Sequence, residues 1–284
     1  MANVVITGST RGIGRGLAVE FLKRSHNVVV SSRRQADVDK AVAELAAVGA
    51  ATTASATGKA SATGKASATG KACDVTVKTD VQALWDHAVA AFGPVDFWIN
   101  NAGRATSRHA VHELPEDLVH TLVDGNLKGS IFGSQIAIAG FRKQGFGALY
   151  NMLGGSSDGK RLTPNMGVYS STKAGDRVLT KYLVAENQNP NITIGTISPG
   201  MLITENWFDE QKQMSAGDWH KVRPLLNILC DYVETSTPWL VDQILANRKS
   251  GRRIAWMSTS KIVGRFVGAK LFGQKRDLFT RFGL

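Results

Sequence analysis

Short apolar runs alternate along this chain with longer segments in which apolar residues recur at helical spacing. Strands are predicted at residues 4–6, 27–32, 95–100, 148–153 and 192–197, with another ending at 72–75 and a candidate edge strand at 251–257. Helices are predicted at residues 16–22, 38–48, 81–92, 118–141 and 169–186. Regular strand–helix alternation is typical of a parallel sheet with helices on both faces. The pattern therefore predicts a single α/β domain over residues 1–260, a doubly wound parallel sheet in a three-layer α/β/α sandwich.

Residues 55–72 interrupt this pattern with three perfect copies of Ser-Ala-Thr-Gly-Lys-Ala. The copies carry no large apolar residue, so they cannot build a solenoid core. We interpret the first two copies as an expanded surface loop before the third strand, without a catalytic role. The alternative is that their lysines contact phosphate.

The composition fits a globular protein, and its charge limits the kinds of molecule that it is expected to bind. The 284 residues are 43% hydrophobic and carry a formal net charge of +11. Such a charge favours a phosphorylated cofactor, an anionic substrate or an anionic lipid surface, or simply serves solubility. Nucleic acid is not expected, because no recognition motif accompanies the charge. Cys73 and Cys230 match no metal or redox spacing, and His109 and His112 lack a third ligand, so free thiols and no metal site are predicted.

The start of the chain leads directly into the first predicted strand. No run of about 18 apolar residues follows anywhere, so no membrane span is expected. These features predict a soluble protein of a reducing compartment, cytoplasmic, or stromal if a plastid transit segment has been removed.

A glycine-rich turn joins the first strand to the first helix. Glycines there let the backbone approach a pyrophosphate, and the helix N-terminus presents free N–H groups. The predicted phosphate loop comprises Gly8, Ser9, Thr10, Arg11, Gly12, Ile13 and Gly14. The second strand ends in Ser32 and Arg33, where an acidic residue would select NADH. Arginine there favours a 2′-phosphate, so NADPH is the predicted cofactor.

Three further segments are expected around this cofactor. Asp74 can accept a hydrogen bond from the adenine amino group, with the backbone of Val75 beside it. The small residues that let the chain pass under the cofactor are Asn101, Ala102 and Gly103. The turn expected to wrap the nicotinamide contains Pro199, Gly200, Ile203 and Thr204.

Tyr169 and Lys173 carry the candidate chemistry. They are four residues apart, so on a helix they share one face. An unperturbed phenol has a pKa of about 10, too high for easy proton exchange at neutral pH. An adjacent ammonium favours the phenolate and lowers that pKa.

These motifs, in this order, resemble the short-chain dehydrogenase/reductase family over residues 3–205. The resemblance implies a Rossmann fold in which Tyr169 donates the proton, while Lys173 holds the nicotinamide ribose and lowers the pKa of the tyrosine. Asn126 matches the family's helix asparagine, which supports a proton-relay water. The catalytic serine is Ser156 by its distance before the tyrosine. Ser157 is the alternative, because the segment after Asn151 departs from the family's Asn-x-Ser-Ser pattern.

A closer resemblance is to the chlorophyll b reductase branch, whose plant enzymes reduce a formyl group on a tetrapyrrole. It is carried by residues 98–103, 151–157, 198–205 and 228–231. The implied function is an NADPH-dependent reductase acting on the aldehyde or ketone of a bulky apolar substrate, with a formyl tetrapyrrole as one candidate. The alternatives are an NAD(P)-dependent alcohol dehydrogenase working oxidatively and a non-catalytic NADPH-binding sensor or scaffold.

Two segments outside these motifs carry further expectations. Residues 205–230 are a predicted substrate lid for a large flat ligand, or ordinary core packing, because large apolar residues gather there: Trp207, Phe208, Met214 and Trp219. Residues 261–284 form a basic tail with apolar residues at helical spacing. That tail is expected either to lie on an anionic membrane surface or to pack against a neighbouring subunit of a homodimer or homotetramer.

Overall fold

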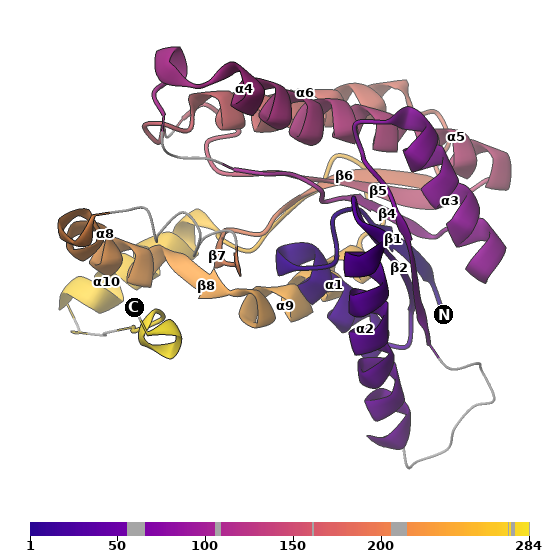
Figure 1. Ribbon diagram of the computed structural model, residues 1–284, viewed down its shortest axis with the longest axis horizontal. Helices are drawn as coiled ribbons and strands as arrows, with labels where there is room; N and C mark the ends of the chain where they lie inside the picture. Colours follow the sequence, from indigo (N-terminus) through magenta and orange to yellow (C-terminus); the bar gives the residue numbers. More distant parts are fainter. Residues whose placement is uncertain are drawn as a thin grey trace.

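The computed structural model describes residues 1–55, 66–105, 109–160, 162–205, 215–271, 273 and 276–283. Its centre is a seven-stranded parallel sheet in the order β3-β2-β1-β4-β5-β6-β9 (Figure 1). The strands are β1 (Asn3–Ile6), β2 (Asn27–Ser32), β3 (Ala68–Ala72), β4 (Phe97–Asn100), β5 (Gly147–Met152), β6 (Ile192–Ser198) and β9 (Arg253–Ala255). The chain winds outward from β1 to β3 and then crosses back to β4, so the predicted doubly wound sheet is confirmed.

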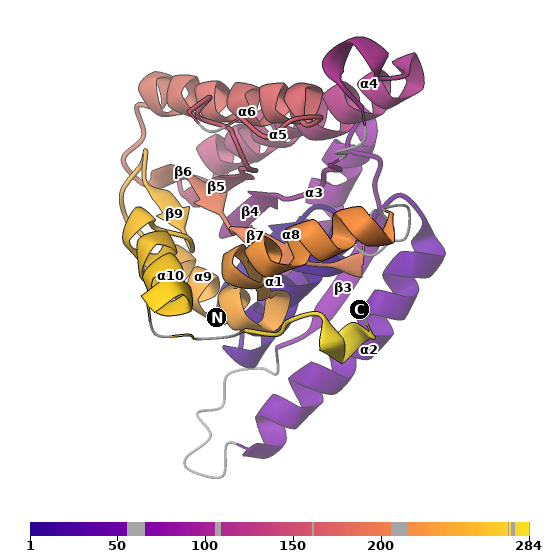
Figure 2. The ribbon, with the colours of Figure 1, turned by 90° about the vertical axis from the view of Figure 1, so that its left-hand side faces the viewer.

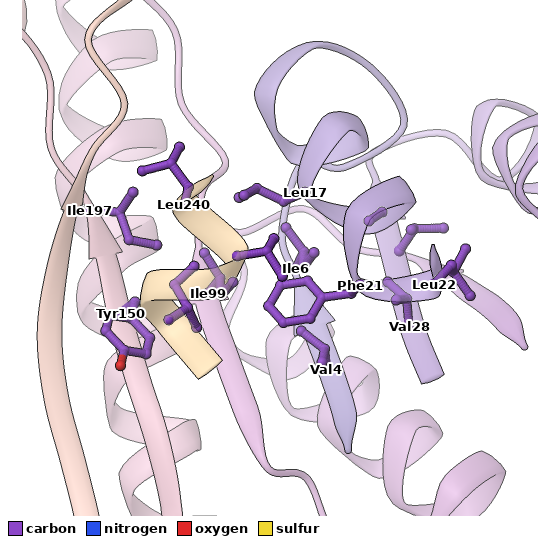
Figure 3. Close-up of a cluster of buried hydrophobic side chains, with 14 of the residues drawn as sticks. Val4, Ile6, Leu17, Phe21, Leu22, Val28, Ile99, Tyr150, Ile197 and Leu240 are labelled. Atoms are coloured by element: carbon purple, nitrogen blue, oxygen red, sulfur yellow. The ribbon is translucent and has the colours of Figure 1, made fainter. Parts of the chain in front are cut away.

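Helices cover both faces of this sheet (Figure 1). One face carries α1 (Gly12–Lys23), α2 (Gln35–Ser55) and α9 (Val233–Ala246), and the other carries α3 (Lys78–Phe92), α5 (Gly129–Gln144) and α6 (Gly167–Glu186). Successive side chains of a strand point to opposite faces, so neighbours on β1 serve different cores. Val4 belongs to the core that also contains Phe21 and Leu240 (Figure 3), and Val5 belongs to the core that contains Trp85. The three-layer sandwich is thereby built as predicted.

The third copy of the repeat forms strand β3. Residues Ala68 to Ala72 pair in parallel with Val28 to Ser32 of β2. Gly70 makes this pairing possible, because a Cβ there would lie 2.5 Å from Val38 Cγ1 and 2.7 Å from the Val30 carbonyl oxygen. The preceding helix is longer than predicted and runs to Ser55, the first residue of the first copy. The expected surface loop of two copies falls mainly on residues 56–65, outside the described residues.

The long helix predicted at 118–141 is interrupted by one π-helical turn. It consists of α4 (Glu116–Leu122), the π turn η2 (Val123–Lys128) and α5, preceded by the short 3-10 turn η1 (Val111–Glu113). A π turn inserts an extra residue into the helical ladder and often marks a functional position. Here it contains Asn126, which is fully buried.

The remaining elements form a cap beside the sheet, made of β7 (Met201–Ile203), α8 (Ala216–Leu229), β8 (Cys230–Tyr232), α10 (Thr259–Leu271) and η3 (Thr280–Phe282). Figures 1 and 2 show these elements on the same side of the molecule. Leu278 and Phe279 are buried against Ile203 and Cys230 in the centre of the cap. The basic tail is therefore part of the fold of its own subunit.

A buried carboxylate fastens the tail to the cap. Asp231 on β8 is 2% exposed and accepts hydrogen bonds from both Arg265 (2.9 and 2.7 Å) and Arg276 (2.7 Å). Trp256 Nε1 donates a further hydrogen bond to it at 2.7 Å. Arg265 turns one side of α10 toward Asp231. The apolar residues of α10 therefore differ in exposure: Ile262 and Phe266 are half-buried, whereas Val263 and Val267 are exposed. A membrane or subunit contact stays a prediction for that exposed stripe.

Candidate active site

The glycine loop has the shape that a pyrophosphate requires. Gly8 and Gly12 adopt positive φ angles of +62° and +57°, which side chains disfavour. A Cβ on Gly14 would lie 2.5 Å from Asn101 Nδ2 and 2.7 Å from the Gly8 carbonyl oxygen. No side chain caps the N-terminus of α1, so its N–H groups and positive dipole end are presented to an anion. The predicted loop of residues 8–14 therefore fits a dinucleotide phosphate.

The segment after β4 holds this loop in place. Asn101 Nδ2 donates hydrogen bonds to the carbonyl oxygens of Thr7 and Gly8, both at 2.9 Å. The Thr7 hydroxyl accepts from the N–H groups of Asn101 and Ala102, both at 3.0 Å. Ser9 is committed to the loop as well, since its hydroxyl donates to the Ile6 carbonyl and accepts from the Ser31 N–H. Its N–H also donates to the Ser31 carbonyl oxygen at 2.9 Å, so both its side chain and its N–H brace the turn.

The two arginines after β2 have different surroundings. Arg34 donates from Nε and Nη2 to both carboxylate oxygens of Asp37, at 2.8 and 2.9 Å, and these hydrogen bonds raise the pKa of Arg34. Arg33 is exposed and forms no ion pair within the described part of the chain. Of the two guanidinium groups, Arg33 is thus the one that no acidic side chain of the described residues engages.

The expected adenine side is also preorganised. Asp74 follows β3, and its Oδ1 accepts from the Thr76 N–H at 2.9 Å and from the Thr76 hydroxyl at 2.8 Å. The next side chain, Val75, packs closely on Gly129 at the start of α5, where a Cβ would lie 2.7 Å from Val75 Cγ2. The local turn fixes the direction of the Asp74 carboxylate, as an acceptor for an adenine amino group requires.

Lys173 and Asn126 meet beside Gly103. Lys173 is 4% exposed, and its ammonium donates to the Met152 carbonyl oxygen at 3.0 Å and to Asp176 Oδ2 at 2.9 Å. Asn126 Oδ1 accepts from the Arg104 N–H at 2.8 Å, which ties the π turn to the segment after β4. A Cβ on Gly103 would lie 2.9 Å from Asn126 Oδ1 and 3.7 Å from Lys173 Nζ. Only a glycine leaves this corner open.

Tyr169 lies one helical turn before Lys173 on α6, with its hydroxyl against the loop that follows β5. A Cβ on Gly154 would lie 2.0 Å from the phenolic oxygen. Sequence reasoning missed this residue, although Gly154 stands third after Asn151, where the Asn-x-Ser-Ser pattern has a serine. Both predicted serines lie just beyond: Ser156 is half-buried with a positive φ of +57°, and Ser157 is buried.

The turn after β6 closes the other side of the site. Gly200 has a φ of +83°, and a Cβ there would lie 2.8 Å from Met257 Cγ. Ile203 is buried beneath this turn. Thr204 faces the glycine loop, since a Cβ on Gly12 would lie 3.7 Å from its Cγ2. The predicted nicotinamide turn and the phosphate loop therefore face one another across one site.

The predicted lid is only partly described. Trp207, Phe208 and Met214 lie outside the described residues. Trp219 is on α8 and packs edge-on against Phe279, with ring centroids 5.0 Å apart. This contact belongs to the interior of the cap, as the alternative of ordinary packing expects for that residue.

Other reactive groups are placed away from this chemistry. Cys73 and Cys230 are free and buried, and burial raises the pKa of each thiol to about 12. Within the described ranges, no three His, Cys, Asp or Glu side chains gather as a metal site would require. Among the same residues, no helix has both the length and the apolar character needed to cross a bilayer.

Comparison with known proteins agrees with this geometry. The family model for short chain dehydrogenases matches residues 2–215. The probable chlorophyll(ide) b reductase NYC1, chloroplastic, of Arabidopsis thaliana is 35% identical over 263 residues, which are 92% of this chain and 51% of that protein. The chloroplastic chlorophyll(ide) b reductase NOL of Oryza sativa subsp. japonica is 32% identical over 287 residues, 98% of this chain and 78% of that protein. The chain thus spans about half the length of the first of these relatives.

Solved structures share the fold. L-Sorbose reductase from Gluconobacter frateurii, complexed with NADPH and L-sorbose, superposes with a TM-score of 0.73 at 20% identity, covering 89% of this chain and 94% of that one. Fold and site together define an oxidoreductase of the Rossmann type with a nicotinamide cofactor. The chain belongs to the short-chain dehydrogenase/reductase family, in the branch related to the chlorophyll(ide) b reductases.

Proposed function

We propose that this protein is an NADPH-dependent reductase of carbonyl groups on bulky, mostly apolar molecules, with a formyl-bearing tetrapyrrole as the leading substrate class. The observation that carries the proposal is the assembly of Tyr169, Lys173 and Asn126 around Gly103 and Gly154, beside a glycine loop shaped for a dinucleotide. The relatives named chlorophyll(ide) b reductase support the substrate class.

The side chains have complementary tasks in such a reduction. Hydride for the carbonyl carbon is the chemistry that a bound reduced nicotinamide supplies. As negative charge develops on the carbonyl oxygen, the Tyr169 hydroxyl donates its proton to that oxygen. The Lys173 ammonium favours the resulting phenolate and so eases the proton transfer. The hydroxyl of Ser156 or Ser157 donates a hydrogen bond to the same oxygen.

The preference for NADPH rests on Arg33. It stands at the carboxyl end of β2, where an acidic side chain would repel a 2′-phosphate. Its neighbour Arg34 is paired with Asp37, so the two arginines are not equivalent. A guanidinium can bind a phosphate through two parallel hydrogen bonds, which adds both affinity and selectivity.

The test is a panel of carbonyl compounds, from small aldehydes to formyl-bearing tetrapyrroles, assayed with NADPH and with NADH. We expect turnover with NADPH that is highest for the bulky members. Tyr169→Phe keeps the ring volume but lacks the proton, so its turnover should fall by at least about 100-fold while NADPH still binds. Substantial turnover in a folded Tyr169→Phe variant would overturn the catalytic assignment.

The same assay separates the two alternatives. A sensor or scaffold would bind NADPH without turning over any carbonyl compound, and Tyr169→Phe would then change nothing. An oxidative alcohol dehydrogenase would reduce the oxidised cofactor with bulky alcohols and would show little reduction of the matching carbonyls at neutral pH. The buried Asn126 and Lys173 are each held by hydrogen bonds and accompany the Tyr169 hydroxyl. They favour catalysis over sensing, because a protein that only binds the cofactor does not need that proton donor.

A further inference from the structure

Asp176 forms a buried ion pair with the lysine of the active site. It lies three residues after Lys173 on α6, and its Oδ2 is 2.9 Å from Lys173 Nζ. The side chains of Lys173 and Asp176 are 5% and 0% exposed. The second carboxylate oxygen, Oδ1, is buried and has no hydrogen-bond partner among the described residues.

Burying a charged carboxylate with an unpaired oxygen costs folding free energy. A buried charge is tolerated when it is paired and fully hydrogen-bonded, and Asp176 is only half satisfied. The neighbouring Ser130 hydroxyl favours the charged carboxylate less than Lys173 does, and it donates to the Asn126 carbonyl oxygen at 2.8 Å. Burial raises the pKa of Asp176, and the charge and hydrogen bond of Lys173 oppose that rise. The ionised form of Asp176 is therefore stabilised mainly by Lys173.

The groups around the pair are otherwise neutral. Ser130 approaches from α5, and the Met152 carbonyl approaches from β5. Asn151 reaches the same helix turn through Thr180, whose hydroxyl donates to the Asp176 carbonyl. Within the described part of the chain, Lys173 is the charged group that acts appreciably on Asp176.

We propose that Asp176 is a positioning residue that holds the Lys173 ammonium and offsets part of its charge, thereby setting the acidity of Tyr169. Two anchors, the Met152 carbonyl and the Asp176 carboxylate, fix Lys173 on the inner side of α6. An ammonium paired with a carboxylate exerts a weaker field on a neighbouring phenol than an unpaired one. The tyrosine is thereby kept protonated to higher pH, as a proton donor requires. This inference rests on the proposed role of Tyr169.

The sign of the effect can be tested without turnover. The chain contains four tyrosines. Carbon-13 labelling of the ring carbon that bears the hydroxyl therefore gives few NMR signals, and the signal missing from Tyr169→Phe is that of Tyr169. In Asp176→Asn the offsetting charge is lost while the shape is kept. We expect the pKa of Tyr169 to fall by roughly one unit, the size of a charge effect across a partly desolvated site.

Asp158→Asn is the matched control. Asp158 is an exposed carboxylate 3.9 Å from Arg177, the residue after Asp176, and it does not contact Lys173. Its removal should leave the Tyr169 titration unchanged. If Asp176→Asn does not fold, Asp176→Leu carries the same expectation, since leucine suits a buried position. An unchanged or raised pKa of Tyr169 in the folded variant, or an equal fall in the Asp158→Asn control, would overturn the proposal.

Activity adds an independent readout. For reduction, the alkaline limb of the pH profile of kcat/KM should move to lower pH in Asp176→Asn by the same amount as the NMR titration. A purely structural role would lower stability and leave that limb in place. If the chosen substrate is not turned over, no pH profile can be measured, but the NMR titration still tests the effect of Asp176 on the pKa of Tyr169. If instead Tyr169→Phe retains turnover, the proposed function fails on its own evidence.

Discussion

The hydroxyl of Tyr169 lies directly against the backbone of Gly154, so close that a Cβ added at position 154 would come within 2.0 Å of the phenolic oxygen. Because Gly154 has no side chain, the Tyr169 hydroxyl can lie beside the loop that follows β5. With no side chain at position 154, the proposed serine hydroxyl would come from farther along this loop, from Ser156 or Ser157.

Gly154→Ala tests that arrangement. The added methyl group must displace the Tyr169 ring, and displacement of a reacting group by about 1 Å can reduce a rate about 100-fold. We expect kcat to fall by that order while NADPH affinity is kept. Gly155→Ala is the control, because a Cβ at position 155 meets nothing within 4 Å. Equal activity of the two variants would show that the tyrosine is not held against position 154.

Much of the fold could be predicted because its strands and helices are also its most periodic segments. Strand β3 is expected from the strand–helix alternation, ending at residues 72–75, and it ends at Ala72. Because Ala-Thr-Gly-Lys-Ala has little strand propensity, its pairing with β2 is decided by tertiary context. The end of α2 was misjudged for a related reason. Its last turns consist of small residues that show no helical pattern, and they end at Ser55, the first residue of the repeat.

The candidate site divides in the same way. Glycines, Tyr169 and Lys173 could be found because their spacing encodes local geometry. The π turn that seats Asn126 leaves no clear mark on the sequence, and Asp176 looks like one more polar helix residue. The Asp231 latch joins residues far apart in the chain, and long-range ion pairs cannot be identified from one sequence.

Cofactor selection can be tested at adjacent arginines. Arg33→Ala should weaken NADPH binding by about 1–3 kcal/mol, the loss of a charged hydrogen bond, and leave NADH binding nearly unchanged. Arg34→Ala is the matched control, because Arg34 is engaged by Asp37. Calorimetric titration of each variant with both cofactors measures the difference. Equal weakening of NADPH and NADH by Arg33→Ala would contradict a contact with the 2′-phosphate.

The Asp231 latch should dominate the stability of the cap. Arg265→Met leaves the buried Asp231 carboxylate short of one partner, and breaking a buried pair in this way costs about 3 kcal/mol or more. Arg281→Met is the control in the same tail, since Arg281 pairs with Glu234 where both side chains are more than half exposed. Exposed pairs contribute about 1 kcal/mol or less. Urea unfolding should therefore separate the two variants clearly.

The latch should also respond to acid. Burial favours a higher pKa for Asp231, but hydrogen bonds from Trp256 and Arg265 and the arginine charges lower it overall. A carboxyl whose pKa is lower in the folded state stabilises the fold above its unfolded pKa of about 3.9 and loses this contribution as the pH falls toward the folded value. The stability difference between the natural protein and Asp231→Asn should therefore shrink below about pH 4. A difference independent of pH in that range would mean that Asp231 is not the ionised partner.

The repeat offers the last test, because its three copies have the same sequence but only one of them is β3. Gly70→Ala places a methyl group 2.5 Å from Val38 Cγ1 and 2.7 Å from the Val30 carbonyl oxygen, so the strand or α2 must shift. Overpacking of this kind costs about 1–3 kcal/mol. The same change at Gly58 or Gly64, which lie outside the described residues, is the comparison, and we expect it to be nearly neutral in thermal unfolding. Equal losses at all three glycines would contradict the assignment of β3 to the third copy.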